Sequence, residues 1–161
     1  MRGLNYYALS AAVFALDRIT KRIIESRLSV FDTHTVIPGF FDIVHARNPG
    51  AAFSMFADST SPWRPFFLIG LSIAALILVA GILRKASRLD KPTAIGLSLI
   101  LGGALGNVFD RIVSGAVTDF LDFYVGTLHW PAFNMADSAI VIGSCLLLLS
   151  MLRPKQQPAG A

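Results

Sequence analysis

Two aspartates beside apolar segments are the residues of this chain best suited to chemistry. Asp119 lies in the stretch Val-Thr-Asp-Phe, shortly after a glycine-rich apolar run, and Asp137 opens an apolar run that carries no other charge. A carboxylate at or inside a lipid bilayer is costly, so its presence there indicates a function. Two carboxylates that come together can share one proton and activate a water molecule. Asp119 and Asp137 are therefore candidates for a general acid–base pair.

Other carboxylates compete with this pair. Asp122 follows Asp119 by three residues and is expected to be a solvated loop residue, whereas Asp110 abuts Arg111 and is expected to be paired and structural. The remaining outer aspartates have no special sequence context; they are Asp32, Asp42 and Asp58. Asp137 has the strongest claim because it opens an otherwise uncharged segment, while Asp122 remains an alternative to Asp119.

The other reactive side chains indicate neither a metal site nor a serine nucleophile. The histidines lie in expected outer loops without a fixed spacing, which argues against a metal site; they are His34, His45 and His129. A Ser54–Lys21 pair is conceivable, but nothing in the spacing supports it. Lys21 does follow Asp17 by four residues, so these two can form an ion pair on one helix face near the membrane interface.

The composition places these residues in a membrane protein. Hydrophobic residues make up 54% of the 161 residues and charged residues 15%, and the mean hydropathy is +0.62. An ordinary soluble domain carries about 25% charged residues. We expect one integral membrane domain over residues 1–161, an all-α membrane protein with four transmembrane helices and a small β-containing loop domain outside the membrane. The apolar stretches long enough to span a bilayer are about 4–24, 65–83, 93–113 and 133–152.

The two longer connections, 26–62 and 115–132, are expected to be outer loops. In the first, Thr35–Ile37 and Phe40–His45 are predicted to be short strands around a Pro-Gly turn, with a second turn at 47–50. The apolar segment 51–56 is predicted to lie back on the membrane. A small sheet resting on the bilayer could hold an extended peptide by strand addition; a plain loop with a hairpin is the alternative.

The distribution of basic residues predicts the orientation in the membrane. The two outer loops carry only Arg27 and Arg47. Basic residues instead crowd the connection between the second and third spans and flank both chain ends; they are Arg2, Arg84, Lys85, Arg88, Lys91, Arg153 and Lys155. By the positive-inside rule, both termini are cytoplasmic, and Asp119 and Asp137 lie near the outer face. The net charge of +4 is mostly this bias and does not require nucleic acid as a partner.

The third apolar stretch ends in polar residues that share a helix face. Asn107 and Arg111 are four residues apart, and Gly103 lies four residues before Asn107. A glycine below two polar groups exposes bare backbone and suggests room for a ligand. Gly102 and Gly106 form a small-xxx-small pair, which favours close helix packing.

The chain resembles the bacterial lipoprotein signal peptidases, also called signal peptidase II. Five blocks carry the resemblance, in order and over nearly the whole length. They are Asp-Arg-Ile-Thr-Lys at 17–21, Asn-Pro-Gly-Ala-Ala-Phe-Ser at 48–54, the glycine-rich stretch 102–111, Val-Thr-Asp-Phe at 117–120, and Phe-Asn-Met-Ala-Asp-Ser at 133–138. None of the acidic or asparagine positions departs from the family pattern, and Pro49 stands where a more variable residue is expected.

The resemblance implies an aspartic endopeptidase of the bacterial cytoplasmic membrane. It implies a prolipoprotein substrate that already carries diacylglycerol on a cysteine, and cleavage just before that cysteine. Asp119 and Asp137 are then the catalytic dyad, without a metal or organic cofactor, and which of them holds the proton stays open. The implied groove residues are Asn48, Gly103, Asn107, Arg111 and Asn134, with Asp17 and Lys21 as structural support. Lipidated prolipoproteins and membrane lipid are the expected partners of a monomer.

Two other classes of function remain open for these residues. Short helices with embedded polar groups could form a small proton-coupled transporter. Against this, the polar groups cluster at one face and not at the midplane, and no inverted repeat is visible. A non-catalytic adaptor that binds signal helices is the other class, and the aspartates would then be incidental. Cleavage of a lipidated prolipoprotein by the purified protein separates these possibilities.

Overall fold

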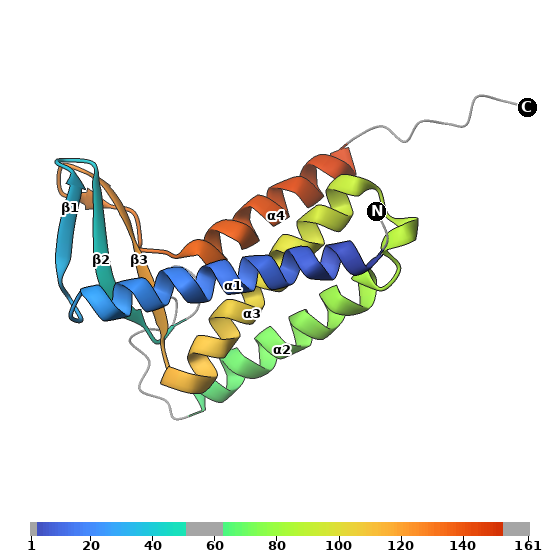
Figure 1. Ribbon diagram of the computed structural model, residues 1–161, viewed down its shortest axis with the longest axis horizontal. Helices are drawn as coiled ribbons and strands as arrows, with labels where there is room; N and C mark the ends of the chain where they lie inside the picture. The colour runs from blue at the N-terminus through green and yellow to red at the C-terminus, as the bar shows by residue number, and fades with distance from the viewer. Residues whose placement is uncertain (1–2, 51–62, 153–161) are drawn as a thin grey trace, which may run out of the picture.

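The protein is a bundle of long helices with a small sheet at one end. The computed structural model describes residues 3–50 and 63–152. The helices are α1 (Gly3–Arg27), α2 (Arg64–Leu83), α3 (Lys91–Ser114) and α4 (Met135–Leu152), with a short 3₁₀ helix, η2 (Ala86–Arg88), between α2 and α3. The start of α1, the α2–α3 connection and the end of α4 lie at the end of the bundle away from the sheet (Figure 1).

Each of the four expected helices is present, within a few residues of its predicted bounds. Within the described ranges, three segments are long and apolar enough to cross a membrane: Phe66–Leu83, Lys91–Ser114 and Met135–Leu152. Helix α1 is as long as the others, but its second half carries charged residues from Asp17 onward. Length and composition therefore mark three helices as candidate membrane spans, and α1 differs from them by its charges.

Helix α3 is the centre of the bundle and packs against α1, α2 and α4. Glycines bring the backbones together. A Cβ at Gly102 would lie 2.5 Å from the Ser10 carbonyl oxygen of α1, and one at Gly96 would lie 2.7 Å from the Gly143 carbonyl oxygen of α4. The close packing predicted for Gly102 is thus confirmed, because no larger residue fits at that distance.

The sheet is antiparallel, with the strand order β1-β2-β3-β4. Its strands are β1 (Thr33–Ile37), β2 (Phe41–Asn48), β3 (Val117–Val125) and β4 (Leu128–His129). The two strands predicted in the first outer loop are confirmed. The turn predicted at 47–50 begins too early, because β2 continues through Asn48 to complete its pairing with β3. The predicted membrane-lying segment 51–56 and Asp58 are outside the described residues.

The second expected outer loop, 115–132, contains the strands β3 and β4, which the sequence analysis did not predict there. Ala46 of β2 pairs with Asp119, and Asn48 pairs with Val117. The first four residues of β3 are all buried. Its sequence therefore lacks the alternation of apolar and polar residues that marks a half-exposed strand. Because this segment pairs with β2, it is a strand. Asp119 therefore lies in the sheet and not in a loop.

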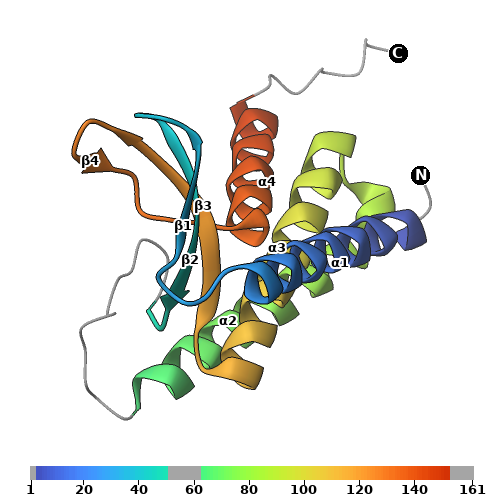
Figure 2. The same cartoon turned by 60° about the vertical axis from the view of Figure 1, so that its left-hand side comes forward.

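The sheet is attached to the C-terminal end of α1. Thr118 of β3 donates a side-chain hydrogen bond of 2.9 Å to Glu25. His45 of β2 is buried, and its Nδ1 lies 2.8 Å from the Leu28 carbonyl oxygen. Figure 2 shows the sheet standing beside the end of α1 and the beginning of α4. These contacts fix the position of β3 relative to the helices.

Candidate active site

The sheet and α4 bring the two candidate aspartates together. Asp119 is the third residue of β3 and only 3% exposed, and Asp137 lies in the first turn of α4. The segment between β4 and α4 returns along β3, where Leu121 and Phe133 exchange backbone hydrogen bonds of 2.9 and 3.1 Å. This return places Asn134 and the start of α4 beside Asp119.

Asn134 is the cap of α4. Its Oδ1 accepts a hydrogen bond of 3.0 Å from the backbone N–H of Asp137, and Asp137 Oδ2 accepts one of 3.3 Å from the backbone N–H of Asn134. This exchange has the pattern of a capping box, in which the third helical residue reaches back to the cap. The positive end of the helix dipole also favours a carboxylate there. Local sequence therefore determines the position of Asp137.

Two asparagines hold the carboxylate of Asp119. Its Oδ1 accepts a hydrogen bond of 2.7 Å from Asn134 Nδ2, and its Oδ2 accepts one of 3.0 Å from Asn48 Nδ2. Asn134 is completely buried. Since its backbone N–H also donates to Asp137, Asn134 contacts both carboxylates.

Burial raises the pKa of Asp119 from 3.8 to about 7, and the nearby charge of Asp137 adds to this increase. Desolvation penalises the ionised form, because a buried carboxylate loses its water, and a second carboxylate repels it. The amides of Asn48 and Asn134 and the positive charge of Lys21 act in the opposite direction. Near neutral pH a substantial fraction of the molecules therefore carries a proton on Asp119.

Asn107 of α3 links Asp137 to a charged cluster deeper in the bundle. Its Nδ2 donates a hydrogen bond of 2.8 Å to Asp137 Oδ1. Its Oδ1 accepts hydrogen bonds from Lys21 Nζ at 3.0 Å and from Asn134 Nδ2 at 3.3 Å. The amide of Asn107 therefore contacts a cation on one side and the candidate carboxylate on the other.

The cluster contains two positive and two negative side chains. Lys21 Nζ lies 2.9 Å from Asp17 Oδ2 and 2.6 Å from Asp110 Oδ2, and Arg18 pairs with the other oxygen of Asp110. The predicted Asp17–Lys21 ion pair is confirmed, and both side chains are completely buried within the cluster. Asp110 is paired as expected, although with Lys21 and Arg18. The sequence analysis missed Arg18 here; its charge within an apolar stretch was the available signal.

Asp17 also connects α1 to the first turn of α4. Its Oδ1 accepts a hydrogen bond of 3.1 Å from the backbone N–H of Ala136. A Cβ at Gly106 would collide with the Asp17 carboxylate, and one at Gly103 would collide with the Ala136 carbonyl oxygen. The space beside Gly103 that suggested room for a ligand is therefore filled by α4.

Arg111 lies at the edge of the site. Its Nη2 donates a hydrogen bond of 2.5 Å to the Gly50 carbonyl oxygen, and its Nη1 donates one of 3.3 Å to the Asn107 carbonyl oxygen. It thus holds the chain just beyond β2. Among the predicted groove residues, the three asparagines contact the carboxylates directly and Arg111 contacts backbone.

The competing carboxylates have other partners. Asp122 was expected to be solvated, but it lies in β3 and its Oδ2 is 2.9 Å from Nδ1 of His129. Asp42 was expected to lack special context, but it is buried and accepts a hydrogen bond of 3.3 Å from the Tyr124 hydroxyl. Among the residues described, no three His, Cys, Asp or Glu side chains are close enough to hold a metal ion. The structure therefore favours Asp119 over Asp122 as the partner of Asp137.

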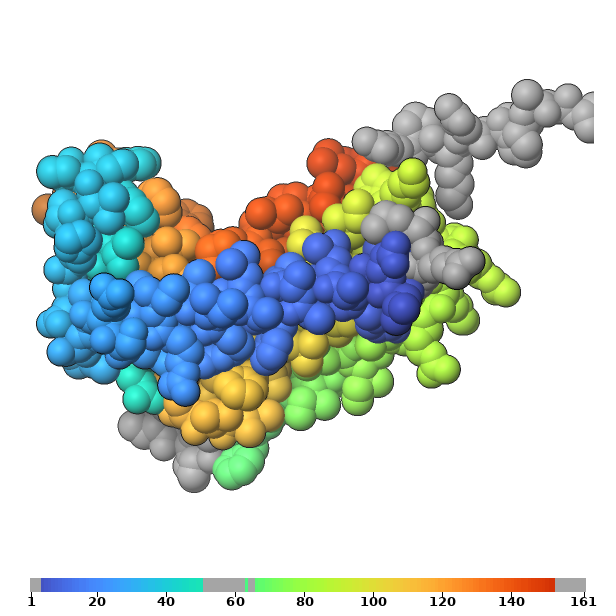
Figure 3. Space-filling model, in the orientation of Figure 1, coloured from blue at the N-terminus to red at the C-terminus, as the bar shows by residue number. Residues whose placement is uncertain are grey.

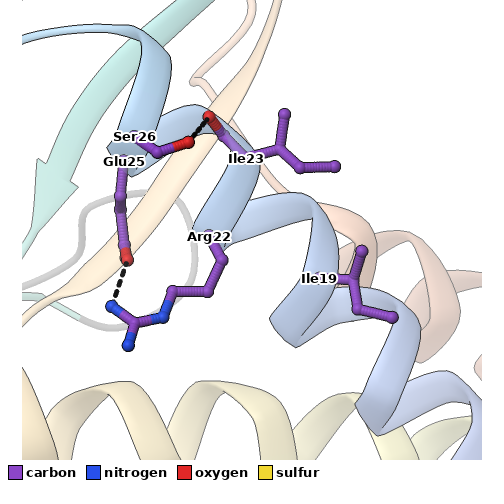
Figure 4. A pocket seen from close by; sticks show the side chains of 5 residues that line it. All are labelled: Ile19, Arg22, Ile23, Glu25 and Ser26. Carbon is purple, nitrogen blue, oxygen red and sulfur yellow. Dashed lines mark hydrogen bonds and ion pairs between the residues drawn. The ribbon is translucent and has the colours of Figure 1, made fainter.

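Two hollows open on the surface around the sheet and α1. The first, of about 370 Å³, is lined mainly by residues of the sheet and of the segment 130–132. Figure 3 separately shows the surface hollowed between the sheet and α4. The lining of the first hollow includes His45, Asp122 and His129. The second, of about 510 Å³, follows the last turns of α1, where Arg22 extends toward Glu25 (Figure 4). Neither hollow is lined by the candidate aspartates.

This chain is similar over nearly its whole length to proteins of known kind. Residues 9–153 match the family model described as signal peptidase (SPase) II. The lipoprotein signal peptidase of Solibacter usitatus is 59% identical over 96% of this chain and 94% of that protein. The lipoprotein signal peptidase of Alteromonas mediterranea is 41% identical over 94% of this chain and 82% of that protein.

Solved structures show the same fold. A bacterial membrane enzyme determined by the in meso method at 2.3 Å resolution is 30% identical and has a TM-score of 0.81, with 96% of this chain and 94% of that chain covered. A second such structure, at 1.9 Å resolution, has a TM-score of 0.82 at the same identity, with 95% and 94% covered.

Proposed function

Because this chain belongs to the signal peptidase II family, we propose that it is an aspartic endopeptidase in which Asp119 and Asp137 are the catalytic pair. Its activity as a lipoprotein signal peptidase, the removal of signal peptides from prolipoproteins, follows from this membership. The observation that carries the proposed pair is the double contact of Asn134, which donates to Asp119 through its side chain and to Asp137 through its backbone.

In the proposed reaction, Asp119 starts protonated and Asp137 starts ionised. Asp137 takes a proton from a water molecule between the carboxyl groups, and the water oxygen attacks the scissile carbonyl carbon. Asp119 donates its proton to the carbonyl oxygen, which gives a gem-diol. Asp137 then passes the proton it took from the water to the leaving amine, and Asp119 takes a proton back from a gem-diol hydroxyl as the peptide bond breaks. The pKa of about 7 for Asp119 supports this assignment, since a carboxyl group must keep a proton near neutral pH to act as the acid.

The asparagines have a structural part in this mechanism. Asn48 and Asn134 each hold one oxygen of Asp119, and Asn107 donates to Asp137. Carboxylates held in one geometry lose less entropy when the transition state forms. We therefore propose that these asparagines keep the pair in place, in addition to lining the substrate groove with Arg111.

The site is proposed to lie at the outer face of the bacterial cytoplasmic membrane, with four spans and both termini in the cytoplasm. The α2–α3 connection, where basic residues gather, lies at the end of the bundle opposite the sheet (Figure 1). Helix α1 is proposed as the fourth span, because the charges of Asp17, Arg18 and Lys21 are balanced within the bundle with Asp110.

The proposed substrate is a prolipoprotein with diacylglycerol on its cysteine, cut just before that cysteine. Acyl chains confine such a substrate to the membrane plane in which the aspartates are proposed to lie. Anchoring contributes about 0.8 kcal/mol for each buried methylene, and it positions the scissile bond before the enzyme binds it. The acyl chains can remain in the lipid while the peptide is cleaved.

The test is cleavage of lipidated and unlipidated precursors by the purified protein, with and without a chelator. We expect cleavage of the lipidated precursor alone, unaffected by the chelator, and its loss in both Asp119→Asn and Asp137→Asn. Asp122→Asn is the matched control, because Asp122 lies in the same strand but pairs with His129. Equal cleavage of both precursors would exclude the lipid requirement, and inhibition by the chelator would exclude the aspartic mechanism. The relatives do not favour the transporter or adaptor alternatives.

A further inference from the structure

Lys21 is completely buried beneath the proposed catalytic pair. An ammonium group has three N–H donors and no acceptor. Lys21 Nζ has three partners at hydrogen-bonding distance, namely Asp17 Oδ2 at 2.9 Å, Asp110 Oδ2 at 2.6 Å and Asn107 Oδ1 at 3.0 Å. The two carboxylates neutralise its charge, and the third donor is directed at the amide of Asn107.

This third hydrogen bond determines which way the Asn107 amide points. An ammonium group can only donate, so the amide oxygen of Asn107 must face Lys21. The amide nitrogen then faces Asp137 Oδ1 and donates to it at 2.8 Å. If the amide were turned over, its NH₂ group would face the ammonium and its oxygen would face the carboxylate. Both contacts would then be repulsive.

Of the two groups that donate to the Asn107 amide oxygen, Lys21 imposes this orientation more strongly than Asn134. Asn134 Nδ2 also donates to Asn107 Oδ1, but at 3.3 Å, and it makes a shorter hydrogen bond of 2.7 Å to Asp119. Asn134 is neutral, whereas a hydrogen bond from a charged donor is roughly twice as strong as one between neutral groups.

We propose that Lys21 is a positioning residue for the proposed protease reaction. It orients the Asn107 amide so that its N–H is always donated to the catalytic carboxylate of Asp137. This inference rests on the proposed role of Asp137 as the base. Lys21 acts through Asn107, and so an effect of Lys21 on the reaction requires the Asn107 amide.

A double-mutant cycle tests this dependence. Lys21→Met is combined with Asp17→Asn, which keeps the buried charges balanced and leaves an amide oxygen to accept from the Ala136 N–H. The other members are the wild type, Asn107→Ala and the triple variant. We measure kcat and KM for a lipidated prolipoprotein and the folded fraction by thermal unfolding. Asn107→Ala and the variant with Lys21→Met and Asp17→Asn should each lose about 10- to 100-fold in kcat, the second with little change in KM. The triple variant should be no worse than Asn107→Ala. Additive losses would overturn the proposal.

The Asn107→Asp variant provides a second test, in which Lys21 is not substituted. The aspartate keeps the side-chain size and an acceptor for Lys21, but its carboxylate has no N–H to donate to Asp137. We expect a folded protein with a loss in kcat at least as large as that of Asn107→Ala. Wild-type kcat in Asn107→Asp would overturn the proposal even if the Lys21 variant does not fold.

Two reference proteins separate this inference from the proposed function. A wild type that does not cleave, or an Asp137→Asn variant that cleaves normally, would contradict the proposed function itself. A wild type that cleaves and an inactive Asp137→Asn variant, together with an additive cycle, would contradict only the role of Lys21.

Discussion

The side-chain amide of Asn134 donates a hydrogen bond of 2.7 Å to the carboxylate of Asp119, across the junction between the sheet and α4. The same side chain accepts a hydrogen bond from the third residue of α4 and so caps that helix. One buried residue therefore determines both where α4 begins and how the aspartate of β3 is held. A change at this residue should affect catalysis more than stability.

Asn134→Ala should lose about 100-fold in activity per folded molecule, because the Asp119 carboxylate loses its hydrogen bond of 2.7 Å and the first turn of α4, which carries Asp137, loses its cap. The missing cap should cost about 1 kcal/mol of stability. The buried groups that lose their hydrogen bond to the Asn134 side chain add to this cost. Cleavage rates normalised to the folded fraction measure the effect.

Asp90→Ala is the matched control for the loss of a cap. The Asp90 side chain caps α3 by accepting from the backbone N–H of Thr93, at the end of the bundle away from the sheet. This variant should be less stable than the wild type but equally active once folded. Equal activity of folded Asn134→Ala and folded Asp90→Ala would contradict the role given to Asn134.

The activity of the wild type should fall as the pH rises through about 7. The pKa of Asp119 is raised to about 7 by burial and by the charge of Asp137, and the proposed acid must be protonated. The same shift affects stability. Because the folded-state pKa lies above the ordinary value of 3.8, the contribution of Asp119 to the free energy of unfolding is full below that value and is lost as the pH rises through about 7.

Asn48→Ala should move this alkaline limb to higher pH. The Asn48 amide stabilises the ionised form of Asp119, so its removal should raise the pKa of that carboxyl group further. The pH profile of cleavage checks this, with carboxyl ¹³C NMR of Asp119 as an independent measurement. A limb that moves to lower pH would contradict the assignment of Asp119 as the acid.

Gly103→Ala should lower both stability and activity. Its new Cβ would collide with the carbonyl oxygen of Ala136, so the first turn of α4, which carries Asp137, must move. Overpacking of this kind costs about 1–3 kcal/mol. Thermal unfolding and cleavage assays on the same preparation measure the two effects.

Gly70→Ala is the control for Gly103→Ala. A Cβ at Gly70 of α2 meets nothing within 4 Å, and alanine favours a helix by about 1 kcal/mol over glycine. This variant should be at least as stable as the wild type and fully active. If Gly103→Ala behaves like Gly70→Ala, the close approach of α3 and α4 is not needed for the site.

Reporter fusions should show the proposed orientation. Fusions after Leu89 and after Gln156 should report the cytoplasm, and one near Asp58 should report the outside. The reason is the basic cluster between α2 and α3, which the positive-inside rule keeps in the cytoplasm. A cytoplasmic signal at position 58 would place the aspartates on the wrong side for exported substrates.

Much of the fold could be predicted from the sequence, because the signals are local. Long apolar runs mark the helices, and the alternating segments around the Pro-Gly turn mark β1 and β2. Asp137 stands out because it is the only charge in its apolar stretch. The blocks of motif residues indicate the family without any structure, and the family match confirms it.

Local signals could not predict how the site is assembled. The segment 117–125 becomes a strand only through its pairing with residues 41–48, about 70 positions earlier in the chain. The same pairing places Asn48 on the carboxylate of Asp119, and the return of the chain along β3 adds Asn134.

The electrostatics of the site also depended on the tertiary structure. The spacing of Asp17 and Lys21 predicted their ion pair, but only the packing of α1 against α3 buries it with Asp110 and connects it to Asn107. The sequence alone thus determined the four long helices, the candidate aspartates and the family. The tertiary structure decided which groups surround each carboxylate, and hence the raised pKa of Asp119, because desolvation and hydrogen bonding depend on residues that meet only when the chain is folded.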